Sequence, residues 1–185
     1  MKSNIISLIL SLFFFLFTSQ LNASDQAWNI AQEGNKIILI RHSLAPGGGD
    51  PAGFKIDDCK TQRNLNTEGI KQAQIIGNLL KKNGIVFNKI FSSFWCRCYK
   101  TLESMGFTIY NLHPGLNSFF QSHVDKKQTL INLNELVYNL PKGKGPYLFV
   151  THYVNILSLT GLAVDSGKIV VYDLENKKSQ KLIFD

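Results

Sequence analysis

The sequence predicts an α/β fold of three layers, in which helices cover both faces of a mainly parallel β-sheet. Two short apolar runs, Lys36–Ile40 and Tyr147–Thr151, are typical of strands that are buried on both faces. Segments with helical periodicity alternate with such runs along the chain, which favours parallel strands joined by helical crossovers. The 185 residues suffice for one domain with a full hydrophobic core.

The first residues have the layout of a secretory signal peptide. Lys2 supplies a positive charge, the apolar run Ile5–Phe17 follows, and a small residue, Ala23, precedes the expected cleavage point. The apolar run is shorter than a comfortable membrane span. We therefore expect residues 1–23 to be removed and residues 24–185 to form a periplasmic or secreted domain with no stable membrane insertion. An uncleaved N-terminal anchor is the alternative.

The first half of the mature domain contains a long segment without regular periodicity, 43–66, which is rich in Gly, Pro and Asp. Such a segment inside a compact domain is usually functional or mobile. Asn66 supplies a helix cap and Glu68 a first-turn acid, so a helix is expected to begin there. The expected elements of this half are a strand at Lys36–Ile40, a helix at Asn66–Gly84, a strand at Asn88–Ser93, a helix at Phe94–Met105 and a strand at Phe107–Tyr110.

The second half is expected to end in an antiparallel hairpin. The turn-like sequence Asn176–Ser179 separates two segments of strand character. Residues Leu116–Asp125 match no element clearly. The expected elements of this half are a helix at Lys126–Leu140, a strand at Tyr147–Thr151, a helix at Asn155–Leu162 and hairpin strands at Lys168–Asp173 and Gln180–Phe184.

The formal net charge of +7 is compatible with an anionic partner. The Lys residues are scattered and form no long block, so they are interpreted mainly as a solvated surface. We expect a small anionic molecule as the partner and no nucleic acid.

Three cysteines in an exported chain allow one internal disulfide. Cys96 and Cys98 flank a single residue and are poorly placed to bond each other. A bridge from Cys59 to Cys96 or Cys98 would leave one thiol over, and three buried, unreactive thiols are the alternative. The Cys and His spacings match no zinc pattern, so no metal is expected.

Charged and imidazole side chains follow several of the predicted strands. One strand ends at Arg41–His42, another ends at His152, and a third runs through Ser92–Ser93 toward Arg97. Because parallel strands present their carboxyl ends at one edge of the sheet, these four side chains are expected to converge there. Guanidinium forks suit phosphate oxygens, and an imidazole can attack phosphorus to give a covalent intermediate.

This pattern resembles the histidine phosphatase superfamily, whose fold is similar to that of cofactor-dependent phosphoglycerate mutase. The matching segments are the apolar strand with Arg41–His42, Arg63–Gly69 with Gln72–Ala73, Ser92–Ser93 with Arg97 and Thr101, and Thr151–His152. The resemblance covers most of the mature domain. It implies that His42 is the nucleophile, and that Arg41, Arg97 and His152 bind the phosphoryl group and stabilise its transition-state charge. Arg63 falls where members often place a further pocket arginine, and a role in fixing the loop is the alternative.

The proton donor expected from the resemblance has no obvious counterpart. Members commonly carry an acidic residue about two dozen positions after the second arginine, where this chain offers only Asp125. Asp57 and Asp58 are further candidates. The acid-phosphatase branch has Asp directly after the second histidine, where this chain has Tyr153.

Other segments resemble an exported bacterial branch that is similar to phosphatases of lipopolysaccharide-core heptose phosphate: the Pro46–Pro51 loop, Asp57–Cys59, Trp95–Cys98 and His152–Asn155. The expected function is therefore phosphomonoester hydrolysis through phosphohistidine, without metal or cofactor, on a small phosphorylated substrate such as a lipopolysaccharide sugar phosphate. The alternatives are a non-catalytic module that binds phosphate esters and a phosphomutase.

Overall fold

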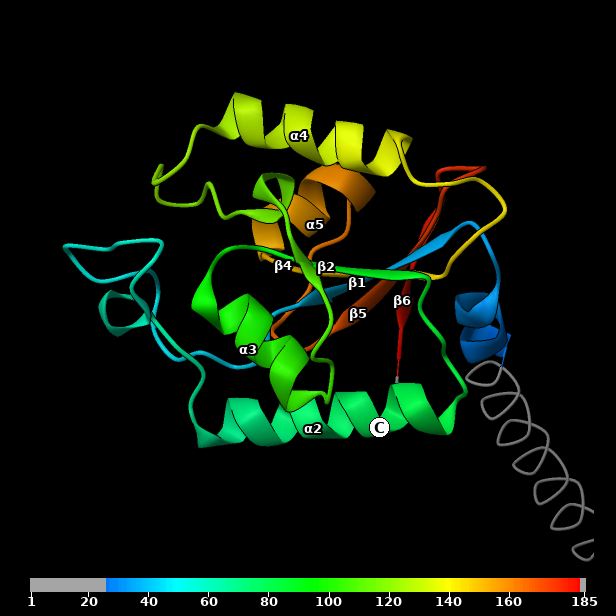
Figure 1. Cartoon of the computed structure of the whole chain (residues 1–185), viewed down its shortest axis with the longest axis horizontal. Coiled ribbons are helices and arrows are strands. Elements are labelled where there is room, and N and C mark those ends of the chain that lie inside the picture. Colours follow the sequence, from blue (N-terminus) through cyan, green and yellow to red (C-terminus); the bar gives the residue numbers. More distant parts are fainter. Residues whose placement is uncertain (1–25, 184–185) are drawn as a thin grey trace, which may run out of the picture.

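A six-stranded sheet forms the centre of the computed structural model, which describes residues 26–183 (Figure 1). The expected signal peptide lies outside the described residues. The strands are β1 (Lys36–Arg41), β2 (Lys89–Ser92), β3 (Asn111–Leu112), β4 (Tyr147–Thr151), β5 (Ile169–Asp173) and β6 (Ser179–Leu182). Their order across the sheet is β3-β2-β4-β1-β5-β6.

The strands β1 to β4 are parallel, and β5 and β6 add an antiparallel hairpin at one side. In the central pair, Leu39 of β1 lies opposite Phe149 of β4. Alternate residues of β1 point to opposite faces of the sheet, as the pleat of a strand requires. Ile37 packs in one core and Ile38 in the other, and both side chains are fully buried. The expected α/β fold with a mainly parallel sheet and a C-terminal hairpin is confirmed.

Helices cover both faces of this sheet (Figure 1). On one face lie α2 (Thr67–Lys82) and α3 (Cys96–Ser104), and on the other lie α4 (Lys126–Tyr138) and α5 (Tyr153–Thr160). Short 3-10 turns occur at η1 (Cys59–Thr61) and η2 (Pro114–Leu116), and residues 26–32 are helical. No helix of residues 26–183 is long and apolar enough to span a membrane.

The start of α2 is fixed by the expected cap. The Asn66 side chain accepts a hydrogen bond from Gly69 N at 2.8 Å, which satisfies one of the free N–H groups at the helix terminus. Gly69 is also where the helix approaches the chain after β1, because a Cβ at this position would lie 2.0 Å from Leu44 O. Glycine at this position therefore allows α2 to pack closely against the chain that follows β1.

The strand expected at Phe107–Tyr110 is wrong, since β3 covers Asn111–Leu112 instead. Phe107 N donates to Leu102 O at 3.0 Å and so completes the end of α3. The Phe107 ring packs edge-on against Phe87. The chain therefore reaches the sheet only at Asn111, which pairs with Phe91.

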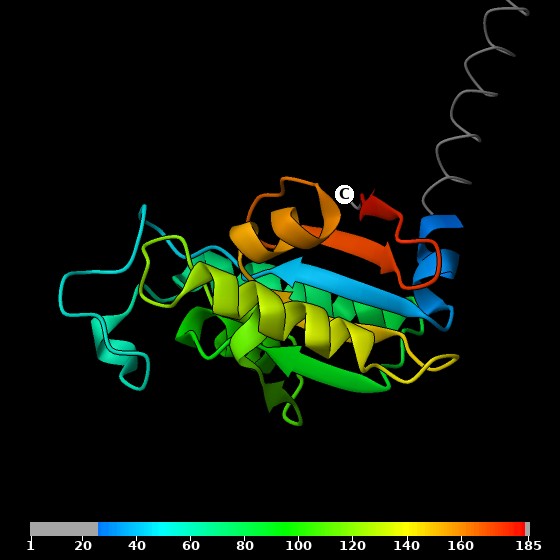
Figure 2. The same ribbon diagram turned by 90° about the horizontal axis from the view of Figure 1, so that it is seen from above.

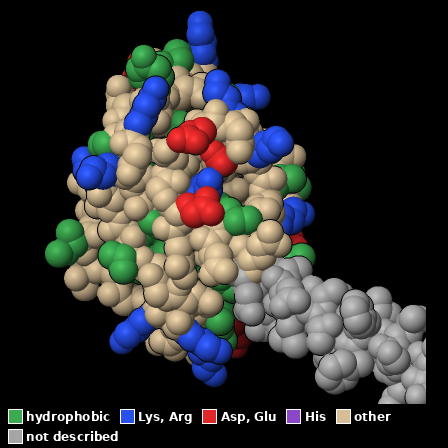
Figure 3. All heavy atoms as spheres, turned by 90° about the vertical axis from the view of Figure 1, so that its right-hand side faces the viewer, with side chains coloured by type: hydrophobic (Ala, Val, Ile, Leu, Met, Phe, Trp, Pro, Cys, Tyr) green, Lys and Arg blue, Asp and Glu red, His purple; other side chains and the backbone are tan. Residues whose placement is uncertain are grey.

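The long segment 43–66 and residues 117–125 lie together beyond the carboxyl ends of the parallel strands (Figure 2). Gln121 joins the two segments: its Oε1 accepts from Asp50 N at 2.5 Å, and its Nε2 donates to Asp50 O at 3.2 Å. Phe54 adds a ring stack with His123 at 4.3 Å between centroids. The opposite end of the molecule carries scattered Lys and Arg side chains that form no single patch on the face in view (Figure 3).

Candidate active site

A cavity of about 350 Å³ opens at the edge of the sheet where β1 and β4 end. Its walls come from both strand ends, from the segment 43–66 and from residues 118–121. The lining residues are Arg41, His42, Gly47, Gly48, Gly49, Arg63, Arg97, Ser118, Phe120, Gln121, His152, Tyr153 and Val154. The structure thus brings together every residue expected to bind the phosphoryl group.

His42 is held by one hydrogen bond from its backbone and one from its ring. Its backbone N–H donates to Thr151 O at 3.0 Å, which continues the pairing of β1 with β4. Its Nδ1 lies 2.8 Å from Ser43 O, and because a carbonyl only accepts, Nδ1 carries the proton. The neutral ring therefore keeps its lone pair on Nε2, the nitrogen left available to a ligand.

The pKa of His42 lies well below its ordinary value, first because the ring is buried and second because Arg97 is positively charged nearby. Burial and the same arginine also hold the pKa of His152 well below the ordinary value. The two rings meet edge to face with centroids 5.4 Å apart. Both imidazoles are therefore neutral at pH 7, which is the state in which His42 can act as a nucleophile.

The tautomer of His152 follows from a short relay of hydrogen bonds. Asn117 Oδ1 accepts from Phe94 N at 3.0 Å and from Ser93 Oγ at 3.1 Å. With its only proton donated to Asn117, Ser93 Oγ acts as an acceptor toward His152 Nε2 at 3.0 Å. Neutral His152 therefore carries its proton on Nε2, and Nδ1 is the nitrogen left for a ligand.

Three guanidinium groups surround the histidines, and each keeps a buried Nε–H without a partner: Arg41, Arg63 and Arg97. Arg41 donates one Nη1 bond to Val164 O at 2.9 Å, and Arg63 donates to Ala45 O. Burial lowers the pKa of Arg41 and Arg63, and the charge of Arg97 lowers both pKa values further. A guanidinium stays protonated at neutral pH even so. Because all three arginines also line the cavity, their positive charge and their guanidinium donors suit an oxyanion bound there.

Asp50 forms hydrogen bonds with the Arg97 side chain and with the backbone of Arg63. Its Oδ1 accepts from Arg97 Nη1 at 2.7 Å and from Arg63 N at 3.0 Å, while its Oδ2 accepts from Trp95 Nε1 at 2.9 Å. Burial alone would raise the pKa of Asp50, but the bonds and charge of Arg97 outweigh it, so the pKa lies below its usual range. Asp50 is therefore ionised and unsuited to donate a proton.

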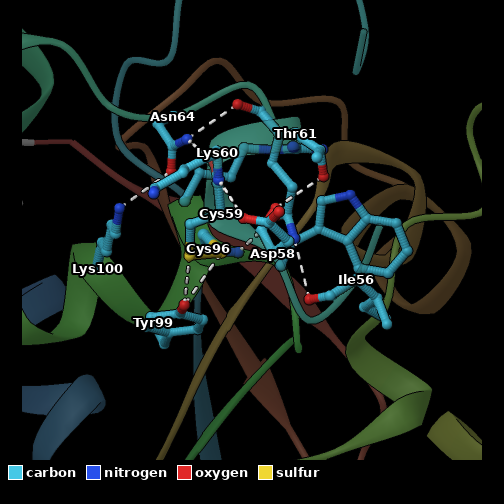
Figure 4. Close-up of a disulfide and its surroundings, with 12 residues drawn as sticks. Ile56, Asp58, Cys59, Lys60, Thr61, Asn64, Cys96, Tyr99 and Lys100 are labelled. Carbon is cyan, nitrogen blue, oxygen red and sulfur yellow. Dashed lines mark hydrogen bonds between the residues drawn. A yellow bond between two sulfur atoms is a disulfide. The ribbon is translucent and has the colours of Figure 1, made fainter. Parts of the chain in front are cut away.

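A disulfide between Cys59 and Cys96 joins the segment 43–66 to the first turn of α3 (Figure 4). It confirms the expectation of a single bridge and leaves Cys98 as a buried free thiol. The Tyr99 hydroxyl lies 2.7 Å from Cys59 Sγ and 3.0 Å from Cys96 Sγ. Beside the bridge, Lys100 Nζ donates to Asn64 Oδ1 at 3.2 Å. These contacts fix the loop that carries Arg63 against the helix that carries Arg97.

The structure does not bring the candidate proton donors into the cavity. Asp125 is exposed and caps α4, where its Oδ1 accepts from Gln128 N at 2.7 Å. Asp58 caps η1 by accepting from Lys60 N at 2.9 Å, and Asp57 is exposed. The expectation of Asp125 as general acid is therefore not supported by its position. Within the described part of the chain, no residue that lines the cavity is a carboxylic acid.

Sequence reasoning did not assign roles to Asp50, Gln121 or Phe120. Asp50 stands in a Gly- and Pro-rich loop, where acids usually serve the turn itself. The only available signal was the placement of a charged residue in a long segment of a compact domain. Phe120 lines the cavity and is 65% exposed, which suits a surface that a substrate covers.

Within residues 26–183, no group of three or more His, Cys, Asp or Glu side chains could hold a metal ion. Burial raises the pKa of the Cys98 thiol to about 12, so this thiol is un-ionised at neutral pH. The cavity itself places neutral imidazoles beside three cationic donors.

This arrangement defines an α/β protein of phosphoglycerate mutase-like fold with a cationic pocket at the carboxyl edge of its sheet. Solved structures of the same fold include the protein histidine phosphatase SixA complexed with tungstate, with a TM-score of 0.55 and 18% identity over 79% of this chain and 93% of that one. SixA from Agrobacterium tumefaciens is similar, with a TM-score of 0.57 and 17% identity over 82% of this chain and 97% of that one. At these identities the likeness is one of fold.

A stretch of 40 residues is 51% identical to 2,3-bisphosphoglycerate-dependent phosphoglycerate mutase 2 of Latilactobacillus sakei. That stretch spans 22% of this chain and 18% of the mutase. No protein-family model matches the chain.

Proposed function

We propose that this protein is a phosphohydrolase that transfers a phosphoryl group from a small phosphorylated substrate to His42 Nε2 and then to water. One observation carries the proposal: a neutral imidazole with a defined free nitrogen shares a cavity with three arginines, each a multiple hydrogen-bond donor with a positive charge. A tetrahedral phosphoryl group offers the acceptors and the negative charge that these donors lack.

In the first step His42 Nε2 attacks phosphorus, and the bond from phosphorus to the leaving oxygen or nitrogen breaks. The resulting positive ring is stabilised by its Nδ1–H bond to Ser43 O at 2.8 Å. Arg41, Arg63 and Arg97 stabilise the charge on the remaining phosphoryl oxygens. In the second step water attacks phosphorus, the P–N bond to His42 breaks, and inorganic phosphate leaves.

The leaving group must depart without a carboxylic acid nearby, because none lines the cavity. Neutral His152 is a weak acid, so it does not replace one well. Weakly basic leaving groups are therefore favoured, such as a phenolate or the imidazole of a phosphohistidine. The second of these is supported by the fold shared with a protein histidine phosphatase.

We place the natural substrate outside the cytoplasm, with a sugar phosphate of the lipopolysaccharide core as the candidate. Its sugar oxygen is a more basic leaving group than a phenolate, so its hydrolysis would need a proton from water and would be slower. Two sequence features support this placement: the signal-like residues 1–23 and the segments that resemble an exported branch of heptose-phosphate phosphatases. Fractionation of cells that express the full chain tests the location. Recovery of the unprocessed chain in the cytoplasm would overturn it.

Hydrolysis of 4-nitrophenyl phosphate tests the reaction. We expect turnover that needs no added metal, that vanadate inhibits, and that His42→Ala abolishes. Unchanged turnover in His42→Ala would overturn the assignment.

A non-catalytic module that binds phosphate esters is the second candidate, and the missing carboxylic acid favours it. It predicts tight binding of the ester with no release of phosphate, so the same assay separates the two. A phosphomutase, the third option, would pass the phosphoryl group to a second hydroxyl instead of water and would release no phosphate from a single substrate.

A further inference from the structure

We propose that a second cavity beside the first binds another anionic group of the substrate, so that the preferred substrate is a phosphate ester that also carries a carboxylate or a second phosphate. The inference rests on the proposed function for the position of the reacting phosphoryl group. The second cavity has a volume of about 450 Å³ and shares two lining residues, Arg41 and Tyr153, with the first.

The topology of the sheet puts the two cavities at the same edge. The strand β5 is antiparallel to β1, and β6 is antiparallel to β5, so β6 runs in the same direction as β1 (Figure 2). The carboxyl end of β6 at Leu182 therefore lies at the edge where Arg41 ends β1. Arg41 N donates to Lys168 O at 3.2 Å, which ties the start of the hairpin to the active-site strand.

The chemistry of the second cavity suits an anion with an apolar body. Among residues 26–183, three cationic side chains line it, Arg41, Lys168 and Lys181, against one carboxylate, Asp165. The other lining residues are the shared ring of Tyr153 and the apolar side chains of Ala163, Val164, Ile169, Leu182 and Ile183. The excess of positive charge favours a negatively charged occupant over a neutral one.

The boundary between the cavities is a fixed part of the fold. Arg41 Nη1 donates to Val164 O at 2.9 Å, and the guanidinium lies 5.7 Å from the centre of the Tyr153 ring. Gln72 accepts from Leu44 N at 2.9 Å and donates to Ser166 O at 3.0 Å, so it joins the exit of β1 to the loop before β5. A substrate that spans the boundary therefore meets a surface that needs little reorganisation.

Two sugar phosphates that differ only at carbon 6 test the inference: glucose 1-phosphate, with a hydroxyl, and glucuronic acid 1-phosphate, with a carboxylate. Each is used as a competitive inhibitor of 4-nitrophenyl phosphate hydrolysis. We expect glucuronic acid 1-phosphate to bind about fivefold more tightly, the size of one or two partly exposed ion pairs. Glucose 1,6-bisphosphate then shows whether a second phosphate serves as well as a carboxylate.

The variants Lys168→Gln and Lys181→Gln are expected to remove the preference for the carboxylate while the KM for 4-nitrophenyl phosphate stays unchanged. Lys178→Gln is the matched control, because it removes the same charge from the turn at the far end of the same hairpin. Equal affinity of the wild-type protein for the two sugar phosphates would overturn the inference. So would a preference that survives both variants.

A failure of the proposed function can be distinguished from a failure of this inference. If the wild-type protein hydrolyses no 4-nitrophenyl phosphate, the two sugar phosphates are compared by calorimetric titration of the same protein. A carboxylate preference that Lys181→Gln removes would support the second cavity even then, and its absence would refute it.

Discussion

Asp50 and Arg97 form a buried ion pair, with Asp50 Oδ1 2.7 Å from Arg97 Nη1 and side chains that are 2% and 4% exposed. The carboxylate comes from the Gly-rich loop and the guanidinium from the first turn of α3, 47 residues apart. This contact fixes the arginine that contributes to the lowered pKa values of both site histidines. It therefore links the architecture of the loop to the chemistry of the pocket.

Replacing Asp50 by Ala should both destabilise the protein and abolish activity. The change leaves Arg97 buried without its partner, which typically costs about 3–5 kcal/mol of unfolding free energy. Denaturant unfolding and kcat/KM for 4-nitrophenyl phosphate measure the two effects. Asp50→Asn is the control for shape, since it keeps an oxygen for Trp95, and we expect it to be the milder variant. Wild-type kcat/KM in Asp50→Ala would contradict the role given to the pair.

The pH dependence of stability should reflect the buried histidines. Because the pKa values of His42 and His152 are lowered in the folded state, the unfolded chain binds more protons as the pH falls below about 6.5. The unfolding free energy should therefore fall from that pH downward, until the folded rings also become protonated. Each histidine contributes up to about 2 kcal/mol of this loss by pH 5.

The variant His152→Gln should show a smaller loss of unfolding free energy between pH 7 and pH 5 than the wild-type protein. A comparison at pH 8, where the imidazoles are neutral in both states, isolates the change in packing. Parallel stability curves for the two proteins across this range would show that His152 does not resist protonation in the folded state.

Loss of the disulfide should cost stability and substrate binding together. Cys59 and Cys96 close a loop with a sequence separation of 37 residues, and a cross-link of that span stabilises a fold by about 3–4 kcal/mol. The variant with both residues changed to Ser should unfold at lower denaturant concentration and show a raised KM, because the loop that carries Arg63 is less restrained.

A reductant provides the control for this prediction. It should reproduce the raised KM in the wild-type protein and have no further effect on the double Ser variant. An unchanged KM in the reduced wild-type protein would show that the bridge does not restrain the site.

Gly69 and Gly48 offer a matched pair of substitutions. A Cβ at Gly69 would meet Leu44 O at 2.0 Å, whereas a Cβ at Gly48 has nothing within 4 Å and no unusual φ. Gly69→Ala should therefore lower the unfolding free energy by about 1–3 kcal/mol, the usual cost of overpacking. Gly48→Ala should change it little, and a larger loss in Gly48→Ala would contradict the packing described for α2.

The central strands, α2 and the C-terminal hairpin could be predicted from the sequence because each rests on a local pattern. The apolar run of β1, the Asn66 cap and the turn at Asn176–Ser179 all act within a few residues. The strand near Phe107 could not, because its position depends on how α3 ends and on pairing with Phe91, 20 positions before Asn111. Short strands take their position from such long-range contacts rather than from their own residues.

The histidines and arginines of the site could be predicted because parallel strands bring their carboxyl ends to one edge. The disulfide partner of Cys59 could not, since the choice depends on the face of α3. Residues two apart on a helix point in nearly opposite directions, so Cys96 faces the loop while Cys98 belongs to the buried core. The role of Asp50 could not be predicted either, because its partner Arg97 is distant in sequence.

The most direct test of the proposed reaction is to trap the phosphoryl group on the protein. Rapid acid-free quenching during turnover of a phosphate ester, followed by mass spectrometry, should find one phosphoryl group on His42 that is stable in base and labile in acid. His42→Ala should carry none. A wild-type protein that turns over substrate without a phosphoryl group on His42 would contradict the account.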